Sequence, residues 1–160
     1  MIRNVNVKDS KDIVEIYNHY VETSIVTFET DLVSGDEMGE RIKSLYIEYP
    51  WIVCEKEGQI VGYAYTSPWK TRSAYKKSVE ISIYVRPGMQ GQGIGKKLMR
   101  ELLDRIEESG VHCIIGGVAL PNAGSVGLHE KYGFEKVAHF KEVGRKFNKW
   151  IDVGYWELII

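Results

Sequence analysis

The sequence predicts a mixed α+β fold in which one sheet is flanked by helices. Apolar side chains alternate with polar ones from Val79 to Val85, as in a half-buried strand, and they recur at helical spacing from Leu98 to Ile106. The expected elements follow the order β-α-α-β-β-β-α-β-α-β-β, which excludes the regular alternation of a doubly wound sheet. At 160 residues, 44% of them hydrophobic, the chain is expected to form a single domain over residues 1–160.

In the first half of the chain, the elements are marked by their apolar period and by capping or breaking residues at their ends. We expect a strand at residues 2–5, a helix capped by Asp9 or Ser10, an extended loop at 23–30, a helix opened by the Ser34–Glu37 capping box and stopped by Pro50, and a hairpin of strands 51–56 and 60–66 around Glu57-Gly58. On the second of these helices, one face is expected to carry Met38, Ile42, Leu45, Tyr46 and Tyr49.

The same signals mark the second half. We expect a polar and aromatic loop at 67–75, a strand at 79–85, a glycine-rich turn, a helix that begins inside the glycine run and ends at Ser109-Gly110, a strand at 112–118, a helix at 125–132 closed by Gly133, and strands at 135–143 and 150–158 around a turn at 144–148.

The turn between the strand at 79–85 and the next helix organises the functional prediction. Pro87 and Gly88 end the strand, because proline has no amide proton to continue a ladder. Glycines at positions 91, 93 and 95 leave backbone amides uncovered at the start of a helix, where the helix dipole is positive. The turn therefore predicts a site for a phosphate-bearing ligand.

Two common phosphate loops do not fit this turn. A nucleoside-triphosphate loop, Gly-x-x-x-x-Gly-Lys-Ser/Thr, would need a glycine at Gln90 and a hydroxyl at Lys97. A dinucleotide loop, Gly-x-Gly-x-x-Gly, would need its third glycine at Lys96. From these residues alone, a ligand site and a loop that only caps a helix are equally open.

The turn does match Gln/Arg-x-x-Gly-x-Gly/Ala at residues 90–95. This resembles the pyrophosphate-binding turn of the GNAT superfamily of acyl-CoA-dependent N-acyltransferases. Residues 122–134 resemble a second segment of that family, Asn-x-x-Ala/Ser-x-x-Leu-Tyr-x-x-x-Gly-Phe, with His129 in place of the usual tyrosine. The expected element order is also similar to the GNAT fold, which implies a mixed, mostly antiparallel sheet.

The departure at His129 narrows the resemblance to the phosphinothricin N-acetyltransferase branch. Further segments that resemble this branch spread over nearly the full length, at residues 23–28, 49–51, 68–75, 78–80, 120–130 and 150–156. The branch acetylates the α-amino group of glutamate-like amino acids: phosphinothricin, methionine sulfoximine and methionine sulfone. The resemblance thus implies direct acetyl transfer from acetyl-CoA in a ternary complex, by a homodimer.

The resemblance also implies how coenzyme A is held. Backbone amides of the strand would bond its pantetheine arm and polarise the thioester carbonyl, and amides of the turn would take its pyrophosphate. Asn122 would bind the amide region of the pantetheine. The expected cofactor-binding residues are Ile83, Tyr84, Val85, Gln90, Gly91, Gln92, Gly93, Ile94, Gly95, Lys96, Asn122 and Ser125.

Transfer to an amine requires a base, because an ammonium has no lone pair. Glu80 is the candidate, since it lies beside the cofactor turn on the polar face of its strand, and the matching Glu of the resembling branch is the proposed base. A solvated strand carboxylate is the structural alternative. His129 is a candidate to protonate the leaving thiolate or to assist Glu80, with local packing as its alternative, and Tyr132 is a second candidate donor.

An amino acid with an acidic tail requires cations in its pocket. Lys70 and Arg72 lie on the loop before Glu80, and Arg binds carboxylates through two parallel hydrogen bonds. A solvated surface role is the alternative for both. Arg145 and Lys146 are further candidates that would reach a neighbouring subunit. The expected substrate-binding residues are Phe28, Glu29, Trp69, Lys70, Thr71, Arg72 and Tyr75.

Composition argues against several other classes of protein. The net charge of −1 gives no reason to expect a nucleic-acid partner, and no apolar run approaches membrane-spanning length. The first residues lack the apolar core of a signal peptide, so we expect a cytoplasmic protein. Cys54 and Cys113 lie in apolar, strand-like runs without metal-ligand spacing, which predicts buried structural thiols and no metal site.

Two other functions stay open at this point. The same fold could serve a polyamine, an aminoglycoside or a protein N-terminus, although a polycationic acceptor favours an acidic cleft and the loop with Lys70 and Arg72 weighs against one. A non-catalytic acyl-CoA-binding regulator would bind coenzyme A without turnover.

Overall fold

A computed structural model describes residues 1–160. The chain forms a seven-stranded sheet in the order β1-β2-β3-β4-β5-β7-β6, in which only β4 and β5 are parallel neighbours. Along the sequence the elements are β1 (Ile2–Asn4), α1 (Ser10–Thr23), α2 (Gly35–Leu45), β2 (Trp51–Lys56), β3 (Gln59–Pro68), β4 (Ser78–Val85), α3 (Ile94–Glu108), β5 (Cys113–Leu120), α4 (Ala123–Lys131), β6 (Glu135–Lys146) and β7 (Lys149–Ile159). The predicted order of strands and helices is confirmed.

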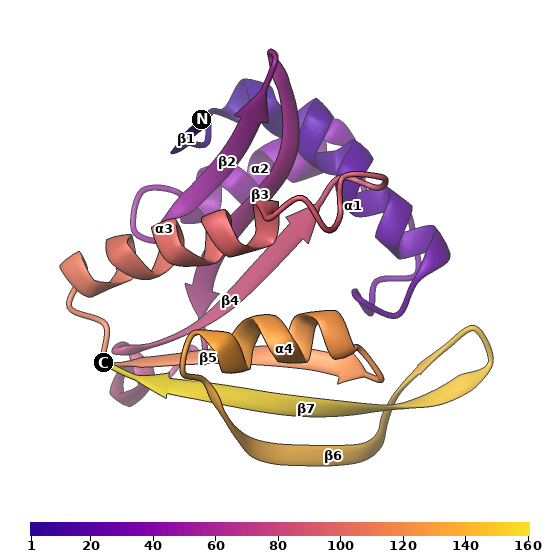
Figure 1. The fold of residues 1–160 in the computed structure, drawn as a ribbon, viewed down its shortest axis with the longest axis vertical. Helices are drawn as coiled ribbons and strands as arrows, with labels where there is room; N and C mark the ends of the chain where they lie inside the picture. The colour runs from indigo at the N-terminus through magenta and orange to yellow at the C-terminus, as the bar shows by residue number, and fades with distance from the viewer.

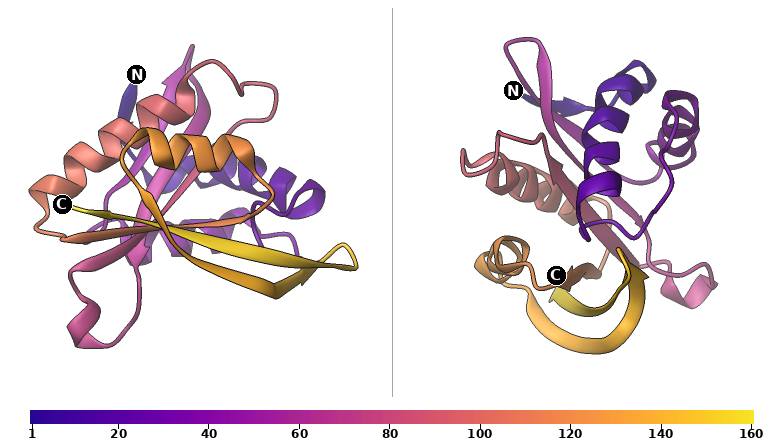
Figure 2. Two further views of the ribbon diagram at one scale, coloured as in Figure 1. Left: turned by 60° about the horizontal axis from the view of Figure 1, so that its bottom comes forward. Right: turned by 90° about the vertical axis from the view of Figure 1, so that its right-hand side faces the viewer.

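Helices cover both faces of the sheet (Figure 1; Figure 2, right). α3 and α4 lie on one face, and α1 and α2 lie on the other. Each side has its own apolar core, because the helical period places apolar residues on the side that faces the strands. Fully buried side chains of the first core include Leu98, Met99, Leu102, Ile106 and Ile114, and those of the second include Ile13, Ile16 and Ile42. None of the helices is both long and apolar enough to cross a membrane.

The parallel pair β4 and β5 stays together over three residues only. Ser78 to Glu80 pair with Cys113 to Ile115, and the pairing then stops. Beyond that point β4 continues along β3 as far as Val85, while β5 continues along β7 as far as Leu120. The two strands therefore diverge (Figure 1), and the edge of residues 81–85 that faces β5 has no strand partner.

The start of α1 differs from the prediction that Asp9 or Ser10 caps it. Asp9 occupies the N-cap position without a side-chain capping bond. Instead, Asn6 caps a preceding 3-10 turn, and the Asp9 carboxylate accepts a 2.7 Å bond from the Asn6 amide and pairs with Arg3 at 2.8 Å. Asn6 and Asp9 form a capping box one turn before the expected cap, because the chain enters the helix through the 3-10 turn.

Two further boundaries differ from expectation. The α2 cap is confirmed on the Ser34 side, whose hydroxyl accepts from the Glu37 amide at 3.0 Å. The helix ends at Leu45 and not at Pro50, so Tyr46, which is 44% exposed, and Tyr49 lie beyond its buried face. The last hairpin turns at Phe147 and Asn148, both with φ above 50°, and not over residues 144–148. Residues 144–146 continue strand β6 because their backbones still pair with β7. Of the two cysteines, Cys54 is buried and Cys113 only partly so.

Candidate functional site

A cleft of about 660 Å³ opens where β4 and β5 diverge. Its walls are β4 from Ile81 onward, the glycine-rich turn with the start of α3, β5 from Gly117 to Ala119, and the α4 helix. Every residue expected to bind the cofactor lines this cleft except Gln92, whose exposed side chain turns back toward Met89. The fold thus gathers residues from three separate stretches of the chain around one cavity.

The glycine-rich turn presents an open helix N-terminus to the cleft. Gly93 is the N-cap of α3 in a left-handed conformation (φ 80°, ψ 4°), and no side chain caps the helix. A left-handed residue at this position favours glycine, and nothing lies within 4 Å of the place where a Cβ would be. The amides of the first turn, from Ile94 to Lys96, have no partner inside the helix. This geometry binds anions.

Tyr20 of α1 also lines the cleft, although its spacing in the sequence is that of a core residue. Its hydroxyl donates to the carbonyl of Val85, where β4 ends, and accepts a 3.2 Å bond from the side-chain amide of Gln90. The Gln90 side-chain oxygen in turn accepts from the Gly88 amide at 2.8 Å. Tyr20 therefore joins the end of β4 to the glycine-rich turn.

Two consecutive glycines of β5 place one candidate catalytic residue on each face of the sheet. A Cβ on Gly116 would lie 2.3 Å from Nε2 of His129, and a Cβ on Gly117 would lie 3.3 Å from Oε1 of Glu80. Because consecutive residues of a strand point to opposite faces, His129 lies on the α4 side of the sheet and Glu80 on the other. The two side chains do not hydrogen-bond each other.

His129 is buried, with 7% of the residue's surface exposed, and it lines the cleft. Its Nδ1 lies 2.7 Å from the carbonyl oxygen of Ser125, one helical turn earlier. A carbonyl can only accept, so Nδ1 carries the proton and Nε2 carries the lone pair. Burial lowers the pKa of His129, an effect that the bond to Ser125 partly opposes, so the ring is neutral at pH 7.

Glu80 is half-buried on β4 and has no hydrogen-bond or ion-pair partner in the chain. Burial raises its pKa, and the positive charge of Lys70 partly opposes this rise. The carboxylate lies next to Gly117, a residue of the cleft wall, without lining the cleft itself. A partnerless carboxylate with a raised pKa beside a cavity is a typical general base.

An aromatic wall stands beside Glu80. Trp69 meets Tyr155 of β7 edge-to-face with ring centroids 5.4 Å apart, and the Lys70 ammonium lies 5.1 Å from the centre of the Trp69 ring. A Cβ on Gly117 would come within 3.0 Å of the Tyr155 ring. Tyr155 carries no signal in the sequence, since only the pairing of β5 with β7 brings it to Glu80.

The other expected substrate residues fall into two groups. Thr71, Arg72 and Tyr75 are exposed and, with Lys70, line a separate hollow of about 380 Å³. Phe28 and Glu29 lie on the segment after α1, where Glu29 pairs with Arg41 at 2.6 Å and accepts from the Tyr17 hydroxyl.

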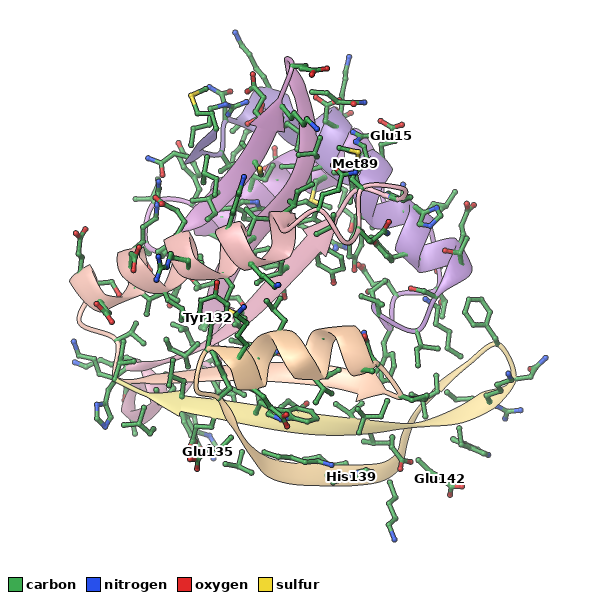
Figure 3. The ribbon with its side chains drawn as sticks, in the orientation of Figure 1. Glu15, Met89, Tyr132, Glu135, His139 and Glu142 are labelled. Atoms are coloured by element: carbon green, nitrogen blue, oxygen red, sulfur yellow. The ribbon has the colours of Figure 1, made fainter.

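Two further candidates are engaged elsewhere. Tyr132 lies between α3 and α4 (Figure 3), where its hydroxyl donates to the Lys96 carbonyl at 2.8 Å, and it does not line the cleft. Lys146, predicted to reach a neighbouring subunit, is buried within its own chain and donates to backbone carbonyls of residues 20–27.

Residues 2–154 match the family model described as an acetyltransferase (GNAT) domain. The chain belongs to the GNAT acetyltransferase family. The resemblance read from the glycine-rich turn and from residues 122–134 is thereby confirmed.

Relatives of known name place the chain near one group of GNAT acetyltransferases. It is 38% identical to phosphinothricin N-acetyltransferase of Streptomyces viridochromogenes, over 98% of this chain and 85% of the relative. It is 33% identical to the L-methionine sulfoximine/L-methionine sulfone acetyltransferase of Salmonella typhimurium, over 98% and 92%.

Solved structures of other GNAT proteins have the same fold. A phosphinothricin acetyltransferase from Sinorhizobium meliloti, in complex with acetyl-CoA, is 33% identical with a TM-score of 0.97, covering 100% of this chain and 88% of that one. A ribosomal-protein-alanine N-acetyltransferase from Brucella melitensis is 34% identical with a TM-score of 0.98, covering 100% and 99%. Relatives that are named for different acceptors therefore share one backbone.

The GNAT cleft of this chain fits coenzyme A on its own geometry. The open amides at the α3 N-terminus suit a diphosphate, and the unpaired edge of residues 81–85 suits an arm that contains amides. Gly91 and Gly93 leave no side chain between the backbone and the ligand.

We predict that Tyr20→Phe weakens acetyl-CoA binding by about threefold to tenfold, because the change removes one hydrogen bond at each end of the Val85–Gln90 junction. Isothermal titration calorimetry measures the dissociation constant. Tyr46→Phe is the matched control, since Tyr46 is exposed and should leave the constant unchanged. Equal constants for Tyr20→Phe and the wild type would contradict the role given to this hydroxyl.

Proposed function

We propose that this protein transfers the acetyl group of acetyl-CoA to the α-amino group of a glutamate-like amino acid, of the class of phosphinothricin, methionine sulfoximine and methionine sulfone. The observation that carries the proposal is the partnerless, half-buried carboxylate of Glu80, which lies between the coenzyme A cleft and the Trp69–Tyr155 wall. The names of the relatives supply the acceptor class.

Glu80 acts as the base. Acetyl-CoA supplies the acetyl group as a thioester. Glu80 removes one proton from the acceptor ammonium and passes it to solvent, which frees the nitrogen lone pair. That lone pair forms the new N–C bond, the C–S bond breaks, and its electron pair leaves on sulfur. The second proton of the nitrogen ends on the thiol, so the products are the amide, coenzyme A and one released proton.

His129 shapes the cleft in this proposal and is not the proton donor. Its Nδ1–H is held by the Ser125 carbonyl, and its other nitrogen carries no proton in the neutral ring. Glu80 is also on the opposite face of β5, out of hydrogen-bonding reach of His129. Tyr132 is not the proton donor in this proposal either, since its hydroxyl donates to the Lys96 carbonyl.

The loop before β4 supplies the positive charge for the acidic end of the acceptor. Lys70 lies near enough to Glu80 to affect its pKa, and it lines one hollow together with Arg72. A carboxylate, phosphinate or sulfone oxygen of the acceptor would face these cations. The same loop weighs against a polycationic acceptor. A protein α-amine is the second candidate acceptor, favoured by the structure of the Brucella melitensis enzyme.

We also propose that the enzyme is a cytoplasmic homodimer that joins two copies through the β6–β7 ribbon. Large apolar side chains on this ribbon are at least half exposed: Val137, Phe140, Val143, Phe147 and Trp150. Such a patch is typical of a protein interface. Sedimentation equilibrium of the purified chain should give twice the mass of 18.3 kDa, and a monomer at micromolar concentration would contradict the proposal.

Release of free thiol from acetyl-CoA in the presence of each amino acid tests the activity. We predict turnover with at least one acceptor of the class and a fall in kcat of about 10²–10⁴-fold at neutral pH in Glu80→Gln. The loss should shrink at alkaline pH, where solvent deprotonates the amine. If the wild type is active and Glu80→Gln loses no activity, Glu80 is not the base. If neither the amino acids nor a peptide with an N-terminal alanine is acetylated, the protein is a non-catalytic acyl-CoA-binding regulator.

The pH dependence of kcat/KM tests whether the positive charge of Lys70 acts on Glu80. Because burial raises the pKa of Glu80 and Lys70 lowers it, Lys70→Met should move the acid limb of kcat/KM to higher pH. A base must be ionised to act, so activity is lost as the pH falls through its pKa. Arg72→Met is the control, because burial and the charge of Lys70, and not that of Arg72, shift the pKa of Glu80. An unmoved limb in Lys70→Met would show that Glu80 does not set it.

A further inference from the structure

Lys146 is a buried lysine that the proposed chemistry does not use. It lies at the tip of the β6–β7 ribbon, with 4% of the residue's surface exposed and no carboxylate in ion-pair contact. Its ammonium donates to the carbonyl oxygens of Ser24 at 2.7 Å and Thr27 at 2.8 Å, and lies 3.5 Å from that of Tyr20. A buried charge persists only when it is well hydrogen-bonded, and here backbone carbonyls are its partners.

These carbonyls belong to the end of α1 and the segment after it. The last carbonyls of a helix have no partner inside the helix and carry the negative end of its dipole. The Tyr20 carbonyl already accepts the Ser24 amide at 3.1 Å. The short bonds of Lys146 go to Ser24, the C-cap of α1, and to Thr27 in the segment after it, from a strand more than 115 residues away in the sequence. The lysine therefore fixes where this segment runs, and does not merely fill space.

A second contact holds the same two parts together. The Phe28 ring packs on the bare backbone of Gly144, where a Cβ would lie 2.2 Å from the ring. β6 reaches this position through an irregular register between Phe140 and Gly144, and Glu142 there has a φ of 52°. The Asp152 carboxylate accepts the Glu142 amide at 2.8 Å and so holds the irregularity. Figure 3 shows Glu142 on the outer strand of the ribbon.

The segment held by Lys146 lines the coenzyme A cleft and also supports strand β4. Tyr20 and Val26 line the coenzyme A cleft. The Thr27 hydroxyl bonds Tyr17 at 2.8 Å, and Tyr17 packs edge-to-face on Tyr84 of β4 with centroids 5.5 Å apart. A shift of the segment would therefore move the cleft wall and the ring that supports β4.

We infer that Lys146 is a positioning residue for acetyl transfer. It holds residues 20–29 against the β6–β7 ribbon and so sets the geometry of the cleft wall. The inference rests on the proposed function only for its kinetic consequence. Its structural part, that one ammonium orders this segment, stands without any activity.

The test compares Lys146→Met with Lys149→Met. Methionine keeps the length of the side chain but cannot donate, and Lys149 is the exposed ladder partner of Lys146. Hydrogen exchange followed by mass spectrometry should show at least about tenfold faster exchange in residues 20–29 of Lys146→Met, since bonds from a charged donor are lost. In Lys149→Met that exchange should match the wild type. The KM for acetyl-CoA should rise about tenfold in Lys146→Met alone, with kcat changed less.

Unchanged exchange of residues 20–29 in Lys146→Met would overturn the inference, and so would faster exchange with wild-type KM values, which would mark a purely structural residue. If Lys146→Met does not fold, Lys146→Gln replaces it, because its shorter and neutral side chain removes the charge and weakens the bonds to the Ser24 and Thr27 carbonyls. Wild-type exchange of residues 20–29 in Lys146→Gln would then overturn the inference. A wild type without turnover would contradict the proposed function, whereas the exchange result would still be decisive for Lys146.

Discussion

The parting of β4 from β5 after three paired residues is the constraint on which the site depends. Each strand is drawn away by its other neighbour, β4 by β3 and β5 by β7, and the sheet opens at its centre. Because the parting comes directly after Glu80 and Ile115, the open edge of β4, the glycine-rich turn and the α3 N-terminus all border one cleft. A continuous sheet would bury those amides in a ladder and leave no place for a cofactor.

Gly116 and Gly117 of β5 follow the point where β4 and β5 diverge, and they allow side chains to approach β5 from both faces of the sheet. Gly116 admits the ring of His129 from the α4 side, and Gly117 admits Glu80 and Tyr155 from the other. A Cβ at Gly116 would collide with the His129 ring, and one at Gly117 would crowd Tyr155 and Glu80. Glycine therefore suits both positions of β5 where the cofactor and the acceptor would meet. Glu80 is thereby left half-buried and without a partner, which raises its pKa and keeps its lone pairs available.

The features that could be predicted from the sequence are local ones. The glycine-rich turn is written in consecutive residues, and the alternation around Glu80 gives its strand and its face. Tyr20 and Tyr155 carry no such signal, and Lys146 was expected at a neighbouring subunit, because each gains its role from a segment far away in the chain: the end of β4, β5, and the end of α1. The capping of α1 and the final hairpin were misjudged for a related reason, since a 3-10 turn and an irregular register extend these elements beyond their sequence markers.

A crystal structure of the protein with coenzyme A and an amino acid of the proposed class tests the central claim most directly. The account predicts the diphosphate on the amides between Gly91 and Lys96, the pantetheine arm along the open edge of β4, and the acceptor nitrogen within hydrogen-bonding distance of Glu80. Phosphates bound elsewhere, or a Glu80 carboxylate turned away from the acceptor nitrogen, would contradict it.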